Sequence, residues 1–202
     1  MLEPLQQRWR QSWPRAKETW SPFVKLQEPI WCQYSVDARR EGLQGSFAMI
    51  RLTDHRIVID LEGVIRSGVQ DYSLEILAHE IGHHIYTPAN LRDNAVAMGR
   101  IRWGLADIES RAPFVANIYE DMLINDKLHR FKQMNMAAVY RQVNEGIQYS
   151  EMWRLIMRSF EYLWKLGRGM LAGDPKFHTA KIDADASLTC LYTAAIFICL
   201  NR

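Results

Sequence analysis

The chain has 202 residues, of which 48% are hydrophobic and 24% charged, a composition typical of one globular domain or of one domain with helical additions. Its formal net charge of +2 gives no reason to expect nucleic acid or an anionic membrane as a partner. Its three cysteines have no CxxC spacing and its N-terminus lacks the apolar core of a signal peptide, so we expect a cytoplasmic protein without a disulfide framework.

The first segment, residues 1–29, is expected to be a helical extension. Four aromatic residues lie there among basic and amide side chains: Trp9, Trp13, Trp20 and Phe23. Their spacing indicates an amphipathic helix whose tryptophans cover part of the core. Proline lacks a backbone N–H and clashes with the preceding turn, so we expect breaks near Pro14 and Pro22.

Residues 30–66 are predicted to form a small antiparallel sheet. The segments 30–36, 47–53 and 55–61 are rich in β-branched and aromatic residues, and Gly or Asp residues that favour turns separate them. A sheet edge just before the next motif would suit a protease, because an extended peptide can pair with an exposed edge.

The segment 73–86, SLEILAHEIGHHIY, contains an HExxH motif on a predicted helix. His79 and His83 are four residues apart, so both imidazoles lie on one face and can converge on one zinc ion at about 2.0–2.1 Å. Glu80 lies beside His79, close enough to handle a proton from a water molecule at the metal. The motif predicts a zinc site.

The pattern around the motif supports a helix with a buried side and a cleft side. Five apolar residues gather opposite the two histidines: Leu74, Leu77, Ala78, Ile81 and Ile85. The pair Thr87-Pro88 is expected to end the helix, because proline disfavours the α conformation in the preceding residue. Gly82 costs about 1 kcal/mol inside a helix, which indicates that another element packs closely there.

A catalytic zinc site usually needs a third protein ligand. The extended pattern HExxHxxGxxH would require glycine and histidine where this chain has Tyr86 and Ala89. The class of zinc site that takes its third ligand from that last histidine is therefore excluded. The other common solution is a carboxylate from a later helix. The segment 112–129 is predicted to be such a helix, with proline in its first turn.

Apolar residues surround nearly the whole circumference of the helix predicted over 112–129, so it should be largely buried. Asn117, Glu120 and Asp121 nevertheless share an arc of about 100° on it. Buried carboxylates are costly unless they are paired or bind a cation, so Glu120 is our first candidate for the third ligand. Asp121 and Asn117 would then hold Glu120 or a histidine in orientation. There are two alternatives: Asp121 is the ligand, or these three side chains pair with arginines of segment 87–111.

The sequence HEIGHH followed by a helix with N-x-x-E-D resembles the gluzincin-type zinc metallopeptidases. Residues 117–125 are similar to the segment after HExxH in metallopeptidases associated with von Willebrand factor A (VWA) proteins and MoxR-type AAA+ ATPases. The resemblance covers about residues 70–130. It implies that the motif histidines and Glu120 bind zinc, that Glu80 is the catalytic base, and that an ATPase or VWA protein is a partner. The chain has no N-E-x-x-S-D pattern, which leaves the choice between Glu120 and Asp121 open.

The remaining segment, 131–202, is expected to be mostly helical. Apolar spacing in 134–166 indicates two amphipathic helices. Residues 187–200 are apolar but fewer than the roughly 20 that span a bilayer, so we expect a buried helix there and no membrane span. Because the chain stops just after it, we expect a fragment of a longer protein or a truncated form.

The expected fold is therefore α+β and zincin-like, with a small antiparallel sheet before the HExxH helix, metal-site helices in 70–130 and a helical C-terminal part. The expected function is zinc-dependent hydrolysis of peptide bonds in a protein or peptide substrate. His178, Tyr86 and Tyr149 are candidate donors to the oxyanion or the substrate. The alternatives are a zinc-binding but proteolytically silent or regulated component of a larger ATPase or VWA-type assembly, another zinc hydrolase, and a structural helical protein.

Overall fold

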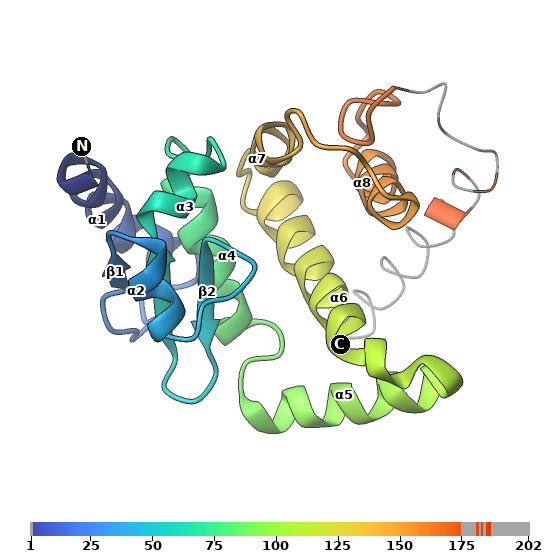
Figure 1. Ribbon diagram of the computed structural model, residues 1–202, viewed down its shortest axis with the longest axis horizontal. Coiled ribbons are helices and arrows are strands. Elements are labelled where there is room, and N and C mark those ends of the chain that lie inside the picture. Colours follow the sequence, from blue (N-terminus) through green and yellow to red (C-terminus); the bar gives the residue numbers. More distant parts are fainter. Residues whose placement is uncertain (1, 175–180, 182, 184, 187–202) are drawn as a thin grey trace. The chain divides into compact units, whose positions relative to one another are not determined.

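The expectation of an α+β protein with a small sheet before the HExxH helix is confirmed by the computed structural model (Figure 1). The structure describes residues 2–174, 181, 183, 185 and 186. The helix expected over 187–200 lies outside these residues. The chain divides into two compact units, Met1–Leu128 and His129–Arg202. In the part that the structure describes, no helix has both the length and the apolar character needed to cross a membrane.

The elements follow one another in a mainly helical order. They are α1 (Leu2–Trp20), β1 (Ile30–Cys32), α2 (Ser35–Arg40), β2 (Ala48–Arg51), β3 (Arg56–Asp60), α3 (Leu61–Arg66), α4 (Ser73–Ile85), α5 (Leu91–Leu105), the 3-10 helix η1 (Ala106–Arg111), α6 (Ala112–Asp126), the π-helical turn η2 (Lys127–Phe131), α7 (Met136–Val143) and α8 (Glu151–Leu163). The helices predicted around the HExxH motif and after it are thus present as α4 and α6.

The sheet has the strand order β1-β3-β2 and is mixed, not wholly antiparallel as expected. β2 and β3 form the expected antiparallel pair, with Ile50 opposite Ile57. β1 instead runs parallel to β3, with Ile30 opposite Val58. A parallel pair needs a crossover of about a dozen residues or more, and α2 together with β2 supplies it between β1 and β3. β2 is therefore an edge strand.

Helix α1 continues through Pro14, so the break predicted there is wrong. Pro14 is exposed, while one face of the helix is buried through Leu5, Trp9, Trp13 and Ala16. This burial offsets the backbone hydrogen bond that proline removes. At the end of α1, the Trp20 indole N–H donates to the carbonyl of Ala78 at 2.7 Å, which fixes α1 against α4.

Gly82 lies at the contact between α4 and α6, where the sequence predicted close packing. A Cβ atom there would lie 2.6 Å from Cγ2 of Ile124 on α6 and 2.8 Å from Cζ2 of Trp20 on α1. Ordinary van der Waals contact begins at 3.4 Å, so no larger residue fits without displacing a neighbour. The prediction is confirmed, and the close approach positions α6 beside the motif histidines.

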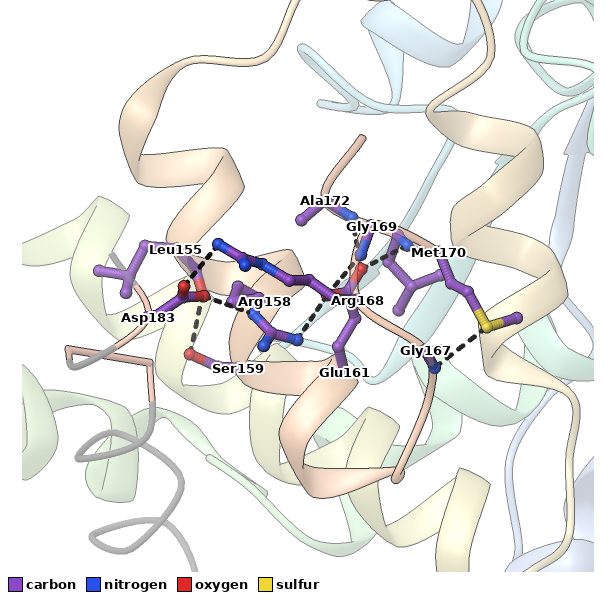
Figure 2. Close-up of polar contacts among 11 residues, drawn as sticks. Leu155, Arg158, Ser159, Glu161, Gly167, Arg168, Gly169, Met170, Ala172 and Asp183 are labelled. Carbon is purple, nitrogen blue, oxygen red and sulfur yellow. Dashed lines mark hydrogen bonds and ion pairs between the residues drawn. The ribbon is translucent and has the colours of Figure 1, made fainter. Parts of the chain in front are cut away.

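The second unit contains α7 and α8, the two amphipathic helices expected between residues 134 and 166. Its buried Glu161 carboxylate organises the loop after α8 (Figure 2). The carboxylate accepts hydrogen bonds from Arg158 and from three backbone N–H groups, those of Gly169, Leu171 and Ala172. Arg158 and Arg168 both pair with Asp183, which joins that residue to the same network.

Candidate metal site between two helices

Both motif histidines have their Nε2 atoms near Asp121 of α6, and oxygen acceptors hold their other ring nitrogens. Nδ1 of His79 lies 2.8 Å from the side-chain oxygen of Asn125, and Nδ1 of His83 lies 3.2 Å from the backbone carbonyl of Thr87. A carbonyl oxygen can only accept, so each Nδ1 carries a proton and donates it. Metal-binding histidines are typically oriented in this way, with the other nitrogen left for the ion.

Asp121 on α6 faces both Nε2 atoms with one oxygen. Its Oδ1 lies 3.4 Å from Nε2 of His79 and 3.3 Å from Nε2 of His83. Ligand atoms about 2.0–2.1 Å from a tetrahedral zinc ion would be about 3.3–3.4 Å from one another. The side-chain amide of Asn117 donates to the second oxygen, Oδ2, at 3.0 Å. Asp121 Oδ1 is therefore spaced from each Nε2 atom as two zinc ligands would be, and the three atoms all lie within 4.8 Å of one another.

Glu120, our first candidate for the third ligand, faces the other edge of the His83 ring. Its Oε2 lies 3.9 Å from Nδ1 of His83, the nitrogen already directed at Thr87. Neighbouring residues of a helix point about 100° apart, so α6 can direct only one of its two adjacent carboxylates at the point where the Nε2 atoms converge. The geometry favours Asp121, which was the alternative, over Glu120.

The charges of Asp121 and the histidines influence one another strongly in the metal-free protein. Burial lowers the pKa of His79, but the hydrogen bond and charge of Asp121 outweigh burial and raise that pKa to about 9. Burial raises the pKa of Asp121, but hydrogen bonds from His79 and His83 reverse the effect and hold it well below its usual range. The carboxylate thus stays ionised and stabilises positive charge between the two helices.

Glu80 is buried beside the histidines, with 6% of its surface exposed. Burial raises the pKa of its carboxyl group, although the nearby histidines and a hydrogen bond from the backbone N–H of Ile50 act in the opposite direction. The bond from Ile50 connects the carboxylate of the motif to edge strand β2. A buried carboxylate with a raised pKa in a cavity is a typical general base.

A cavity of about 470 Å³ opens against these residues. α4 and α6 line it with His79, Glu80, His83, Asn117, Glu120 and Asp121. The other described lining residues are Gly42, Leu43, Gln44, Ser46, then Ala48, Met49 and Ile50 of β2, and Leu52, Pro88 and Asn94. The structure thus brings the predicted carboxylates and histidines together at one cavity.

None of the expected donors to an oxyanion or substrate is among the described residues that line the cavity. Tyr86 is not among the described residues that line the cavity, and its ring stacks with Trp20 at 6.2 Å while its hydroxyl is buried. Tyr149 belongs to the second unit, where the guanidinium of Arg154 lies over its ring at 5.6 Å. His178 is outside the part of the chain that the structure describes.

The sequence analysis missed Asn125, which holds the His79 ring. Asn117, Asp121 and Asn125 follow one another at four-residue intervals on α6, so this helix carries one polar stripe facing α4. That spacing was the signal that could have identified it.

Two imidazoles and the Asp121 carboxylate lie close together beside the buried Glu80 carboxylate, and the first three form a group that could hold a metal ion. His79 donates to Asn125, His83 donates to the Thr87 carbonyl, and Asn117 donates to Asp121, so all three side chains are held in orientation by hydrogen bonds. No family model, curated protein or solved structure matches the chain, so the functional argument depends on this geometry.

Proposed function

We propose that the chain is a zinc-dependent peptidase, in which His79, His83 and Asp121 bind the metal and Glu80 acts as the catalytic base. The observation that carries the proposal is the position of Asp121 Oδ1, 3.3 and 3.4 Å from the two Nε2 atoms. Those separations match the edges of a tetrahedral zinc site, and both histidines have their Nδ1 protons bound elsewhere.

The surroundings of the site support a peptide as the substrate and a zincin-like arrangement of sheet and helix. β2 is an edge strand, it packs against α4, and its residues line the cavity. An extended peptide can add to such an edge through backbone hydrogen bonds, which would place a peptide bond close to the histidines. The cavity of about 470 Å³ has room for side chains of the peptide.

Each residue of the site has a distinct task in this proposal. A bound zinc ion would lower the pKa of a water molecule toward about 7 and polarise the substrate carbonyl. Glu80 takes a proton from the water as its oxygen attacks the carbonyl carbon, and delivers that proton to the amine nitrogen when the C–N bond breaks. Asn125 and the Thr87 carbonyl keep the imidazoles in position, and Asn117 does the same for Asp121.

The metal ligands are tested by zinc binding. Purified wild-type protein should bind one equivalent of zinc, measured by elemental analysis and by competition with a chromophoric chelator. Asp121→Asn should weaken the affinity by at least a hundredfold, whereas Glu120→Gln should weaken it much less. Asp107→Asn is the matched control, since Asp107 is exposed on η1 and does not line the cavity. A hundredfold loss of zinc affinity in Glu120→Gln, together with unchanged affinity in Asp121→Asn, would contradict the assignment.

The catalytic base is tested by cleavage of casein and of a mixed peptide library. We expect the wild type to cleave and Glu80→Gln to retain zinc but lose at least a hundredfold in rate. Glu75→Gln makes the same change at a glutamate five residues earlier on α4, outside the described lining of the cavity, and should keep the wild-type rate. A zinc-loaded wild type that cleaves nothing would refute the peptidase and leave a zinc-binding, proteolytically silent protein.

A further inference from the structure

The cavity beside the candidate metal site is lined by more carboxylates than the charge of one divalent metal matches. Its described lining residues include three carboxylates, Glu80, Glu120 and Asp121, and neither lysine nor arginine. The arginine on the adjoining strand, Arg51, is already paired with two acids, Glu41 at 2.8 Å and Asp54 at 2.7 Å. A dication matches the charge of two ionised carboxylates, so the third has no counter-charge among the described lining residues.

Glu120 is the carboxylate to which neither zinc binding nor proton transfer assigns a task. It is 6% exposed, and its Oε1 is buried without a hydrogen-bond partner among the residues that the structure describes. Nδ1 of His83 lies 3.9 Å from its Oε2, and that nitrogen is already directed at the Thr87 carbonyl. A buried carboxylate without a close partner is costly, and a positive charge brought into the cavity would remove that cost.

We propose that Glu120 selects substrates that bring a positive charge into the cavity, either a lysine or arginine side chain or a free α-amino group. The proposal rests on the peptidase function, because it assigns the class of substrate to the same site. An ammonium or guanidinium group entering the cavity would gain a charge-assisted hydrogen bond to Glu120, and an acidic group would be repelled by it. A neutral residue would be neither attracted nor repelled by this charge.

Cleavage and binding of matched peptides test this inference. One set of peptides carries lysine, glutamine or glutamate at a single internal position, with both ends blocked. A second set has a free or an acetylated N-terminus and no basic side chain. The kcat/KM values are measured with the wild type, and Kd values are measured by fluorescence anisotropy with zinc-loaded Glu80→Gln, which does not turn the peptides over. The two sets distinguish a side-chain cation from a terminal amine.

We expect the cationic member of at least one set to exceed its neutral counterpart by tenfold or more in kcat/KM and in affinity. Glu120→Gln should reduce that ratio to less than threefold. The matched control is Glu109→Gln, which removes one exposed carboxylate from η1 outside the cavity and should keep the wild-type ratio. If Glu120→Gln does not fold, Glu120→Ala takes its place in the same measurements, and a wild type without a cation preference overturns the inference in either case.

Two results would overturn the inference: no preference for cations in either set, or a preference that Glu120→Gln leaves intact. Failure of the peptidase proposal is a different result. In that case zinc-loaded wild type cleaves none of the peptides, while the anisotropy measurements still report whether Glu120 recognises a cation.

Discussion

Replacement of Gly82 by alanine tests the packing that brings α4 and α6 together at the metal site. The added methyl carbon would meet Ile124 Cγ2 at 2.6 Å, about 0.8 Å inside the 3.4 Å at which ordinary contact begins, and Trp20 Cζ2 at 2.8 Å. Ile124 is fully buried and β-branched, so it has little freedom to rotate away. The helices themselves have to separate.

The net effect on stability combines two opposing terms. Overpacking of a core costs about 1–3 kcal/mol, and the two short contacts here place Gly82→Ala in the upper part of that range. Alanine recovers about 1 kcal/mol of helix propensity over glycine. We therefore expect a net loss of about 1–2 kcal/mol in the free energy of unfolding. Because Gly82 lies between the two histidines on α4, the same displacement should also weaken zinc binding at least tenfold.

Urea unfolding of the metal-free protein measures the stability term, and chelator competition measures the zinc term. Gly99→Ala is the matched control, because Gly99 lies inside α5 with nothing within 4 Å of the added Cβ, so this change should stabilise the protein by up to about 1 kcal/mol. Ile124→Ala, which removes the contacting carbons, should cost less in the Gly82→Ala background than in the wild type. The reasoning is refuted if Gly82→Ala is as stable as the wild type.

Three further predictions concern single side chains. Asn125→Ala removes the acceptor that orients His79 and should weaken zinc binding by about 10–100-fold in chelator competition; unchanged affinity would contradict that role. Glu161→Gln leaves Arg158 and the loop N–H groups without their anion and should destabilise the second unit by about 3 kcal/mol or more in thermal unfolding; a loss below 1 kcal/mol would count against it. Burial raises the pKa of the Cys32 thiol to about 11, so its alkylation by iodoacetamide should be very slow at pH 8 and should accelerate as the pH rises toward 11. Peptide mass mapping measures the rate, and reaction at the rate of free cysteine would refute the prediction.

Much of the local structure could be predicted from the sequence, because it depends on spacing within one element. The apolar period and the proline after Thr87 indicated α4, and the proline in the first turn indicated α6. The direction of β1 could not be predicted, because it depends on the path of the chain through α2, a six-residue helix too short to show an apolar period. The break at Pro14 was wrongly predicted, because the cost of a proline is set within its own helical turn, whereas the burial of Trp9 and Trp13 that compensates for it depends on distant segments.

The arrangement of the candidate site could also be predicted in part. His79, Glu80 and His83 lie within one helical turn, so their mutual arrangement follows from the motif. The choice between Glu120 and Asp121 depends on the rotation of α6 about its own axis relative to α4. Packing at Gly82 and Ile124 contributes to that rotation, and this long-range contact has no signature in the sequence around either carboxylate.

The position of a bound zinc ion is the most direct test of the central claim. Crystals of the protein grown with zinc would give an anomalous difference map recorded at the zinc absorption edge. We predict one strong peak between α4 and α6, within about 2.3 Å of Nε2 of His79, Nε2 of His83 and one carboxylate oxygen of Asp121. A zinc-soaked crystal with no peak at these three atoms, or with a peak that Glu120 and not Asp121 completes, would contradict the account.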